Sequence, residues 1–296
     1  MAVPSNTTVR SNVAEIVPAE WIQDSIIRVK RPKPLFALLC NTDVVPPGKG
    51  STVNIPSVAA LDPPAGSKTE GDVFTVVQMD TGEDTMTGGF VGHQVRLSYE
   101  AIHDSAFDVL DLATSESMAG LMNRVDSDGF ALCSSLANVG VDVGTSALTD
   151  ADVQEAVRQF NEQNPNFDGM PVGVLNAKQF LDWSLDLSAN GGTALGGDAQ
   201  SNEMAKLIGP EAGFKCVRHG VAWYQSNNIP VATGEATGFI GVAGKLSPFW
   251  LRSWQELRVV QEDDPDYASV KLTFMIRYGV AVVDDDQAVS ITSDGA

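Results

Sequence analysis

The chain has 296 residues, of which 43% are hydrophobic and 19% are charged. These fractions are typical of a folded globular protein rather than a disordered one, and the length allows one or two domains. The formal net charge is −19, from 38 acidic and 19 basic residues. That balance argues against a nucleic-acid-binding surface as the main activity, because phosphate contacts require a basic face.

Cysteines and hydrophobic runs indicate the compartment. Cys40, Cys133 and Cys216 are odd in number, far apart and surrounded by apolar residues. This pattern predicts buried, reduced thiols in an intracellular protein. The first ten residues, MAVPSNTTVR, lack the apolar core of a signal peptide, and no apolar run reaches the ~18 residues of a membrane span. We therefore expect a soluble cytoplasmic product.

The first fifty residues differ in charge from the rest. They hold six bases and four acids, a net charge of +2, so the remainder carries −21. A helix is predicted over 14–29, because its apolar residues share a broad face and Pro32 and Pro34 follow it. A basic arm could clasp the acidic body of a neighbouring copy. A solvated basic segment explains the same pattern.

Two predicted strands, 51–58 and 90–98, flank a segment rich in proline, glycine and charge. Residues 51–58 (STVNIPSV) alternate as a strand should. The segment between the strands holds one apolar run, at 73–77. A loop of about thirty residues inside a compact domain is unusual unless it binds something. We therefore expect a hairpin whose loop, 59–90, projects outward.

A long helix is predicted over 114–140 (TSESMAGLMNRVDSDGFALCSSLANVG), after a shorter helical pattern at 101–113. Its apolar residues recur at three- and four-residue steps, which places them on one stripe. Thr114 or Ser115 is expected to cap its N-terminus and Gly140 to end it. Such a helix is a rigid support for a sheet.

The weak point of this helix is predicted at Asp126 to Gly129. Aspartate is a poor helix former, and glycine costs about 1 kcal/mol relative to alanine. Asp126, Asp128 and Gly129 are accordingly the candidate hinge residues.

The remainder of the chain alternates helices and strands. Thr149, with Asp152 in the capping-box position, predicts the start of a helix, and Asn176 is expected to cap another that runs to Asp186. Residues 188–201 are rich in glycine and alanine and predict a flexible surface loop; its glycines include Gly191, Gly192, Gly196 and Gly197. Strands are predicted at 170–175, 214–217, 221–225, 239–242, 249–254, 257–262 and 270–283.

No motif for enzymatic chemistry emerges. The glycine-rich stretch 191–197 lacks the Lys-Ser/Thr pair of a phosphate-binding loop, and 48–52 lacks the upstream glycine spacing. The three histidines, His93, His103 and His219, have no partner at metal-ligand spacing. We expect no catalytic residue, no cofactor and no metal.

Two acidic clusters could in principle hold a hard divalent cation. They are Glu262–Asp264 with Asp266, and Asp284–Asp286. Neither has the spacing of a calcium loop with its central glycine and terminal glutamate. Solvated turns explain both clusters better.

Several segments resemble the major capsid proteins of tailed bacteriophages, which have the Hong Kong 97-type fold. The resemblance lies in the order of EWIQDSIIRVKRPKPLFALLC and GKGSTVNIPSV (within 20–58), VRLSYEAIHDSAFDVLDL (95–112), FKCVRHGVAWYQSNNIP (214–230) and VKLTFMIRYGVAVVDDDQAVSI (270–291). It spans about residues 14–292. No single motif is specific; the ordered series carries the likeness.

The resemblance implies an α+β fold with an amino-terminal arm, an extended loop, a long spine helix, and peripheral and axial domains. The arm would be residues 1–50, and 51–98 a strand pair with the extended loop 59–90 lying over a neighbouring subunit. Residues 99–144 and 270–296 would form the peripheral domain, with the spine helix at 114–140. Residues 145–269 would mainly form the axial domain, with the glycine-rich loop near the capsomer centre.

The resemblance also implies a function. Many copies would form pentamers and hexamers of an icosahedral shell around double-stranded DNA, without sequence-specific contacts and with a negative inner face. Contacts between subunits are expected from Arg28, Lys30, Arg31, Lys33, Lys68, Glu70, Asp72, Glu83 and Asp84. Further partners would be a separate scaffolding protein, a portal and a decoration protein, with no membrane. The shell would be assembled in the bacterial cytoplasm and end as the virion capsid.

Two alternatives remain at this stage. The first is an encapsulin-like shell protein of a cellular compartment, which would share the fold. The second is an acidic soluble hydrolase with an unrecognised metal site.

Overall fold

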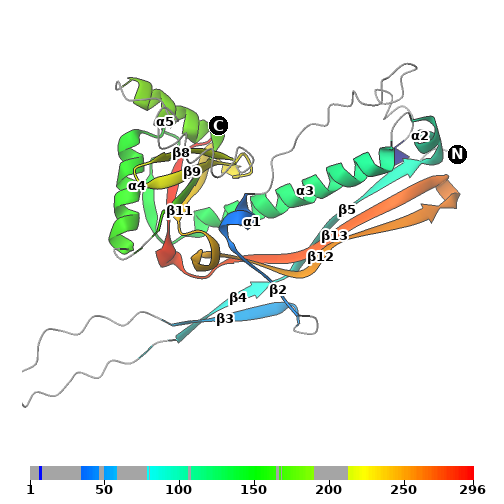
Figure 1. Cartoon of the computed structure of the whole chain (residues 1–296), viewed down its shortest axis with the longest axis horizontal. Coiled ribbons are helices and arrows are strands. Elements are labelled where there is room, and N and C mark those ends of the chain that lie inside the picture. Colours follow the sequence, from blue (N-terminus) through cyan, green and yellow to red (C-terminus); the bar gives the residue numbers. More distant parts are fainter. Residues whose placement is uncertain are drawn as a thin grey trace, which may run out of the picture.

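The computed structural model describes residues 7–8, 35–46, 50–58, 79, 81–105, 108–164, 167, 169–189 and 213–296. They form two lobes and a ribbon (Figure 1). The spine lobe is a five-stranded sheet with helices α2 (Tyr99–Asp104) and α3 (Val109–Ala131). The second lobe is a seven-stranded sheet with α4 (Asp150–Gln163) and α5 (Ala177–Ala189). The ribbon is β3 (Thr52–Val58) paired with β4 (Thr81–Thr87).

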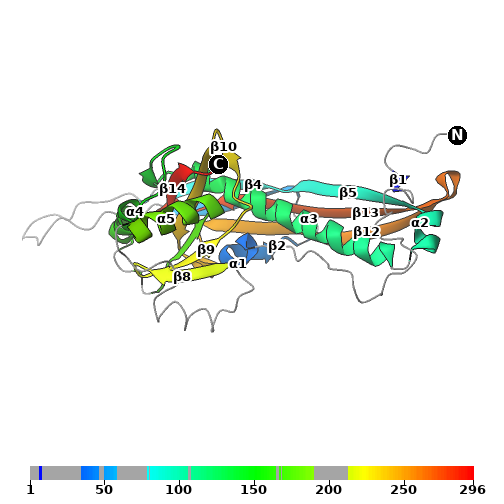
Figure 2. The ribbon, with the colours of Figure 1, turned by 90° about the horizontal axis from the view of Figure 1, so that it is seen from above.

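The sheet of the spine lobe is long and covered by a helix on one face. Its strands are, from edge to edge, β1 (Thr7–Thr8), β5 (Gly89–Ser98), β13 (Ser269–Val282), β12 (Phe249–Asp264) and β2 (Asn41–Val44). The three central strands are antiparallel, and each edge strand is parallel to its neighbour. Alternate residues of β13 are buried against α3, as a pleated strand requires. On the opposite face no helix lies among the described residues (Figures 1 and 2).

The long helix is confirmed, but its predicted ends are wrong. Asp108 caps α3, accepting hydrogen bonds from the N–H groups of Leu110 and Asp111 at 3.0 and 3.1 Å. The hydroxyls of Thr114 and Ser115 instead donate to carbonyls of the preceding turn. The helix ends in a 3₁₀ turn, Leu132–Ser135.

Gly140, the predicted end of the helix, lies in strand β6 (Val139–Asp142) of the second lobe. A Cβ at this position would lie 2.2 Å from Val289. The glycine therefore serves close packing between strands and not helix termination.

The predicted hairpin is present, but its second strand differs from the prediction. Strand β3 pairs with β4, from Thr52 opposite Thr87 to Val58 opposite Thr81, whereas β5 pairs with β13. The sequence places residues 81–87 in the loop because β4 shows no apolar alternation, and Met86 is the one side chain of this strand that is buried. The connection 59–80 lies outside the described residues, apart from Met79.

The sheet of the second lobe carries both remaining helices on one face. Its strand order is β6, β14 (Ala288–Asp294), β11 (Glu235–Gly241), β7 (Val172–Leu175), β9 (Val221–Gln225) and β8 (Phe214–Arg218), with β10 (Val231–Ala232) added to β11. Buried residues of α4 and α5, among them Phe160 and Trp183, pack on this sheet around Trp223. The capping box of Thr149 and Asp152 is confirmed, and Asn176 caps α5 through the N–H of Lys178 at 3.2 Å.

The other face of this sheet forms the junction between the lobes. It packs on α1 (Phe36–Leu39), on the C-terminal end of α3 and on Phe249. Cys40 and Cys133 are buried here, and all three cysteines are buried and outside any disulfide, as predicted. Burial raises the pKa of Cys40 to about 12 and also raises that of Cys133.

Strand pairing differs from the expected division of the chain at two places. Strand β12, expected within the axial range 145–269, belongs to the sheet of the spine lobe. Strand β14, expected with the peripheral range 270–296, belongs to the sheet of the second lobe. An apolar strand does not encode which of two sheets it joins. The predicted helix 14–29 lies outside the described residues, and no described helix is long and apolar enough to cross a membrane.

Candidate functional site

Among the residues expected to contact other subunits, Glu83 and Asp84 are described. They lie on β4, where Glu83 is opposite Pro56 and Asp84 is opposite Ile55. The side chain of Glu83 is exposed and that of Asp84 is half-buried. The other expected contact residues lie outside the described residues: Arg28, Lys30, Arg31, Lys33, Lys68, Glu70 and Asp72. So do the glycines of the expected axial loop, Gly191, Gly192, Gly196 and Gly197.

The ribbon leaves the spine lobe on the side opposite α3 (Figure 1). Near the body its inner side chains, Ile55 and Met86, are buried. The outward positions of both strands are exposed. A two-stranded hairpin is marginal by itself in water, so the ribbon depends on contacts at its base and on whatever covers it.

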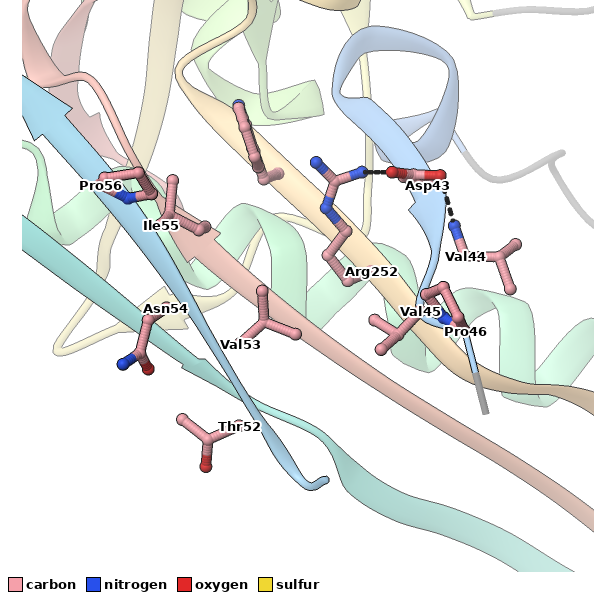
Figure 3. A pocket seen from close by; sticks show the side chains of 11 residues that line it. Asp43, Val44, Val45, Pro46, Thr52, Val53, Asn54, Ile55, Pro56 and Arg252 are labelled. Carbon is pink, nitrogen blue, oxygen red and sulfur yellow. Dashed lines mark hydrogen bonds and ion pairs between the residues drawn. The ribbon is translucent and has the colours of Figure 1, made fainter. Parts of the chain in front are cut away.

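A groove of about 590 Å³ lies where the ribbon meets the body (Figure 3). Its walls are β2 and β3, and its lining is mostly apolar, with side chains such as Val45, Val53 and Ile55. The guanidinium of Arg252 pairs with Asp43 at 2.7 Å and lies 4.4 Å from the ring centroid of Trp250. Burial lowers the pKa of Arg252.

Among the described residues no helix covers the face of the spine-lobe sheet opposite α3, which we call the open face, and four bases on this face outnumber two acids, Glu262 and Asp264. The alternation of β5, β12 and β13 places four cationic side chains on it: Arg96, Arg258, Lys271 and Arg277. Arg96 pairs with Asp264 at 3.2 Å and Lys271 with Glu262 at 2.7 Å. Phe90 is 67% exposed on the same face, with Arg277 over its ring at 5.1 Å. A basic face with an exposed aromatic ring suits an acidic protein partner.

The predicted hinge residues lie where three parts of the molecule meet. Asp126 is 1% exposed, and its Oδ1 accepts the N–H of Phe36 at 2.6 Å. Its Oδ2 accepts the side-chain amide of Asn228, from the loop after β9, at 2.9 Å. One carboxylate thus joins α3 to α1 and to the second lobe. Burial raises its pKa, and these hydrogen bonds oppose the shift.

Gly129 makes room for an aromatic ring. A Cβ there would lie 2.3–2.5 Å from ring atoms of Phe36, which also packs edge-on against Phe130. Asp128 accepts the hydroxyl of Tyr278 on β13 at 2.6 Å and pairs with Arg124. The helix is continuous through these residues. All three predicted hinge residues are therefore contact residues, and Phe36, which the sequence did not single out, is the partner of Asp126 and Gly129.

The remaining polar candidates have partners within the fold. His93 stacks on Phe274, and Nε2 of His219 lies 2.9 Å from Asp150. Asp150 is partly buried, which raises its pKa, but hydrogen bonds from His219, Trp183 and Gln154 outweigh burial and lower it to about 2. Among the described residues, no group of three His, Cys, Asp or Glu side chains is arranged to hold a metal ion.

Comparisons with known proteins agree with this geometry. A family model described as phage capsid protein matches residues 83–291. No curated protein matches the chain. Solved structures with a similar fold include the capsid of Ralstonia phage GP4 (10% identity, 94% of this chain and 95% of that chain, TM-score 0.71). Microbacterium phage Oxtober96 is also similar (16% identity, 97% of this chain and 99% of that chain, TM-score 0.66). So is the Cyanophage Pam1 capsid asymmetric unit (13% identity, 94% of this chain and 96% of that chain, TM-score 0.65).

The α+β architecture, with a spine helix along a long sheet and a projecting ribbon, is similar to that of Hong Kong 97-type major capsid proteins. The family match covers more than half of the chain. The chain therefore belongs to the phage capsid protein family and is a structural major capsid protein.

Proposed function

We propose that copies of this chain assemble into pentamers and hexamers of an icosahedral shell that encloses double-stranded DNA. In this shell the ribbon of one copy lies over the open sheet face of its neighbour. The observation that carries this proposal is the pair of surfaces described above: a projecting ribbon and an uncovered face on one subunit. Each surface would cover what the other leaves exposed. Because the contact repeats around a ring of subunits, many weak contacts add up to a stable assembly.

The charges of the two surfaces are complementary. Residues 59–87 contain six acids and one base, Lys68. The open face carries Arg96, Arg258, Lys271 and Arg277 within a chain of net charge −19. Asp264 and Glu262 pair with Arg96 and Lys271, so Arg258 and Arg277 supply its excess positive charge. Opposite charge across an interface speeds encounter and excludes wrong registers more than it adds affinity. The complementarity therefore favours one orientation of neighbouring subunits.

Further partners follow from the same proposal. A separate scaffolding protein would guide assembly, a portal would occupy one vertex and a decoration protein would bind outside. Assembly takes place in the bacterial cytoplasm, and the finished shell is the virion capsid. The acidic body limits adhesion of packaged DNA, since like charges repel. As a shell component the chain needs no cofactor and no enzymatic activity.

The test is assembly of purified protein, followed by electron microscopy with and without a scaffolding partner. Replacing Glu83 and Asp84 by Lys is expected to reduce the shell yield at least fivefold, because like charges would face each other. Adding Arg258→Glu and Arg277→Glu to that variant should recover part of the yield. Glu100→Lys, an exposed acid on α2, is the matched control and should assemble normally.

Two results would contradict the proposal. One is a chain that stays monomeric under every assembly condition. The other is an equal shell yield from the unmodified chain and all three charge variants, which would exclude the pairing of ribbon and open face.

The alternatives are less well supported. The family match is to phage capsid proteins, which does not favour a cellular compartment shell. The hydrolase alternative requires a metal site, and the described residues contain no group of three His, Cys, Asp or Glu side chains that could hold a metal ion. Metal analysis and a hydrolase screen of the purified protein test that alternative.

A further inference from the structure

Trp254 occupies a slot between two glycines at the root of the ribbon. We define the root as Gly50 and Ser51, which precede β3, together with Gly88, which follows β4. A Cβ on Gly88 would lie 2.5–2.9 Å from three atoms of the indole, and one on Gly279 would lie 3.0 Å from it. Any larger side chain at Gly88 would therefore displace the ring.

The alternation of β12 aims the indole at the ribbon. Ser253 is opposite Tyr278, which packs on the α3 side of the sheet. Its neighbour Trp254 therefore points to the other side, from which the ribbon leaves. The pairing of β12 with β13 shifts register on both sides of Gln255, directly after the indole.

The indole contacts both strands of the ribbon at the root. Its Nε1 donates to the carbonyl of Gly50 at 2.9 Å, just before β3 begins. Its ring covers Gly88, just after β4 ends. The N–H of Gly88 donates to Ser51 at 2.9 Å, and Arg277 donates to the carbonyl of Gly88 at 3.3 Å. One side chain thus holds the entry and the exit of the ribbon against the sheet.

We propose that Trp254 is a positioning residue that fixes the angle at which the ribbon leaves the body. The angle matters because the ribbon is a lever. Seven residues span about 23 Å at ~3.3 Å per residue, so a tilt of roughly 20° moves the far end by about 8 Å. A displacement of that size would miss any complementary surface. The consequence for assembly rests on the proposed function, but the positioning itself does not.

The test measures the ribbon in the unassembled protein. Spin labels on Thr85→Cys and Gln94→Cys report the distance between ribbon and sheet, since the native cysteines are buried and protected from the label. With Trp254 intact we expect one narrow distance distribution. Trp254→Ala should broaden it at least twofold. Trp254→Phe keeps a ring over Gly88 but loses the bond to Gly50, so an intermediate width is expected.

Two adjacent glycines provide a matched control. Gly88→Ala forces a methyl group into the indole, whereas a Cβ on Gly89 would meet nothing within 4 Å. We expect Gly88→Ala to broaden or shift the distribution and Gly89→Ala to leave it unchanged. In the double variant Gly88→Ala/Trp254→Ala the methyl group has no ring to displace, so the distribution should match that of Trp254→Ala. Circular dichroism confirms that each variant is folded.

The outcomes separate the two proposals. Equal widths with and without Trp254 overturn the positioning role, whatever the assembly yield. A broadened distribution in the labelled protein, together with poor assembly of the same variant without labels, supports both proposals. A broadened distribution with normal shells upholds the positioning role and overturns the assembly role of the ribbon.

Discussion

Gly129 shows that one residue can be unfavourable for its helix and required by its neighbours. Glycine lowers helix propensity, so replacing it by alanine in an open position adds up to about 1 kcal/mol of stability. At Gly129 the ring of Phe36 occupies the space that the methyl group would need. Overpacking of this kind typically costs about 1–3 kcal/mol. At this position the steric cost outweighs the gain in helix propensity, so alanine destabilises the fold.

We therefore expect Gly129→Ala to lower the free energy of unfolding by about 1–2 kcal/mol. Gly120→Ala lies in the same helix, where a Cβ would meet nothing within 4 Å, and should raise it. Urea unfolding of both variants measures the difference. Equal stability of the two would mean that Phe36 yields freely, and the contact would then have no energetic weight.

At the scale of elements, the carboxylate of Asp126 ties three of them together. It accepts hydrogen bonds from α1 and from the loop that contains Asn228, and it lies in the interior of α3. A bend of α3 at Asp126 to Gly129, the hinge that the sequence predicts, would have to break these bonds. We keep the hinge as a proposal, with the addition that its bending is coupled to the position of α1.

We expect Asp126→Ala to cost about 2–4 kcal/mol, because the buried N–H of Phe36 and the half-buried amide of Asn228 would lose their acceptor. Asp126→Asn can keep one acceptor and should cost less. Hydrogen exchange at the amide of Phe36 would accelerate in both variants, and most in Asp126→Ala. Unchanged exchange at Phe36 together with unchanged stability would contradict the role of Asp126 in linking these elements.

The sequence predicted elements whose signals are local and missed those that depend on distant partners. Thr149 and Asp152 lie three residues apart, so the capping box could be read directly, as could the cap at Asn176. Strand β4 carries no apolar pattern because Met86 is the one side chain of this strand that is buried. The slot of Trp254 depends on Gly50 and Gly88, more than 160 residues earlier in the chain. No spacing rule connects such positions.

At the scale of the molecule, two carboxylates give opposite pH dependences. The pKa of Asp150 is about 2 in the folded protein, below its ordinary 3.8. Above pH ~4 its ionised carboxylate adds about 2 kcal/mol to the free energy of unfolding, and this contribution is lost as the pH falls toward ~2. The pKa of Asp126 is raised by burial. Its charged form therefore opposes folding at neutral pH, and that cost disappears as acid protonates it.

We expect Asp150→Asn to lower the free energy of unfolding by about 2 kcal/mol at pH 7 and by much less near pH 2.5. Chemical unfolding at both pH values measures the change. Glu100→Asn, at an exposed position, serves as the control. An effect of Asp150→Asn that is independent of pH would show that its hydrogen bonds matter and its charge does not.

The two sheets also constrain when the chain can fold. Strand β14, residues 288–294, lies inside the seven-stranded sheet between β6 and β11, and β12 and β13 fill the middle of the other sheet. Neither sheet can close while the ribosome is still making residues 249–294. Pairings so distant along the chain are slow to form. A nascent subunit therefore cannot present a finished surface to its neighbours, and truncated chains are excluded from the shell by topology alone.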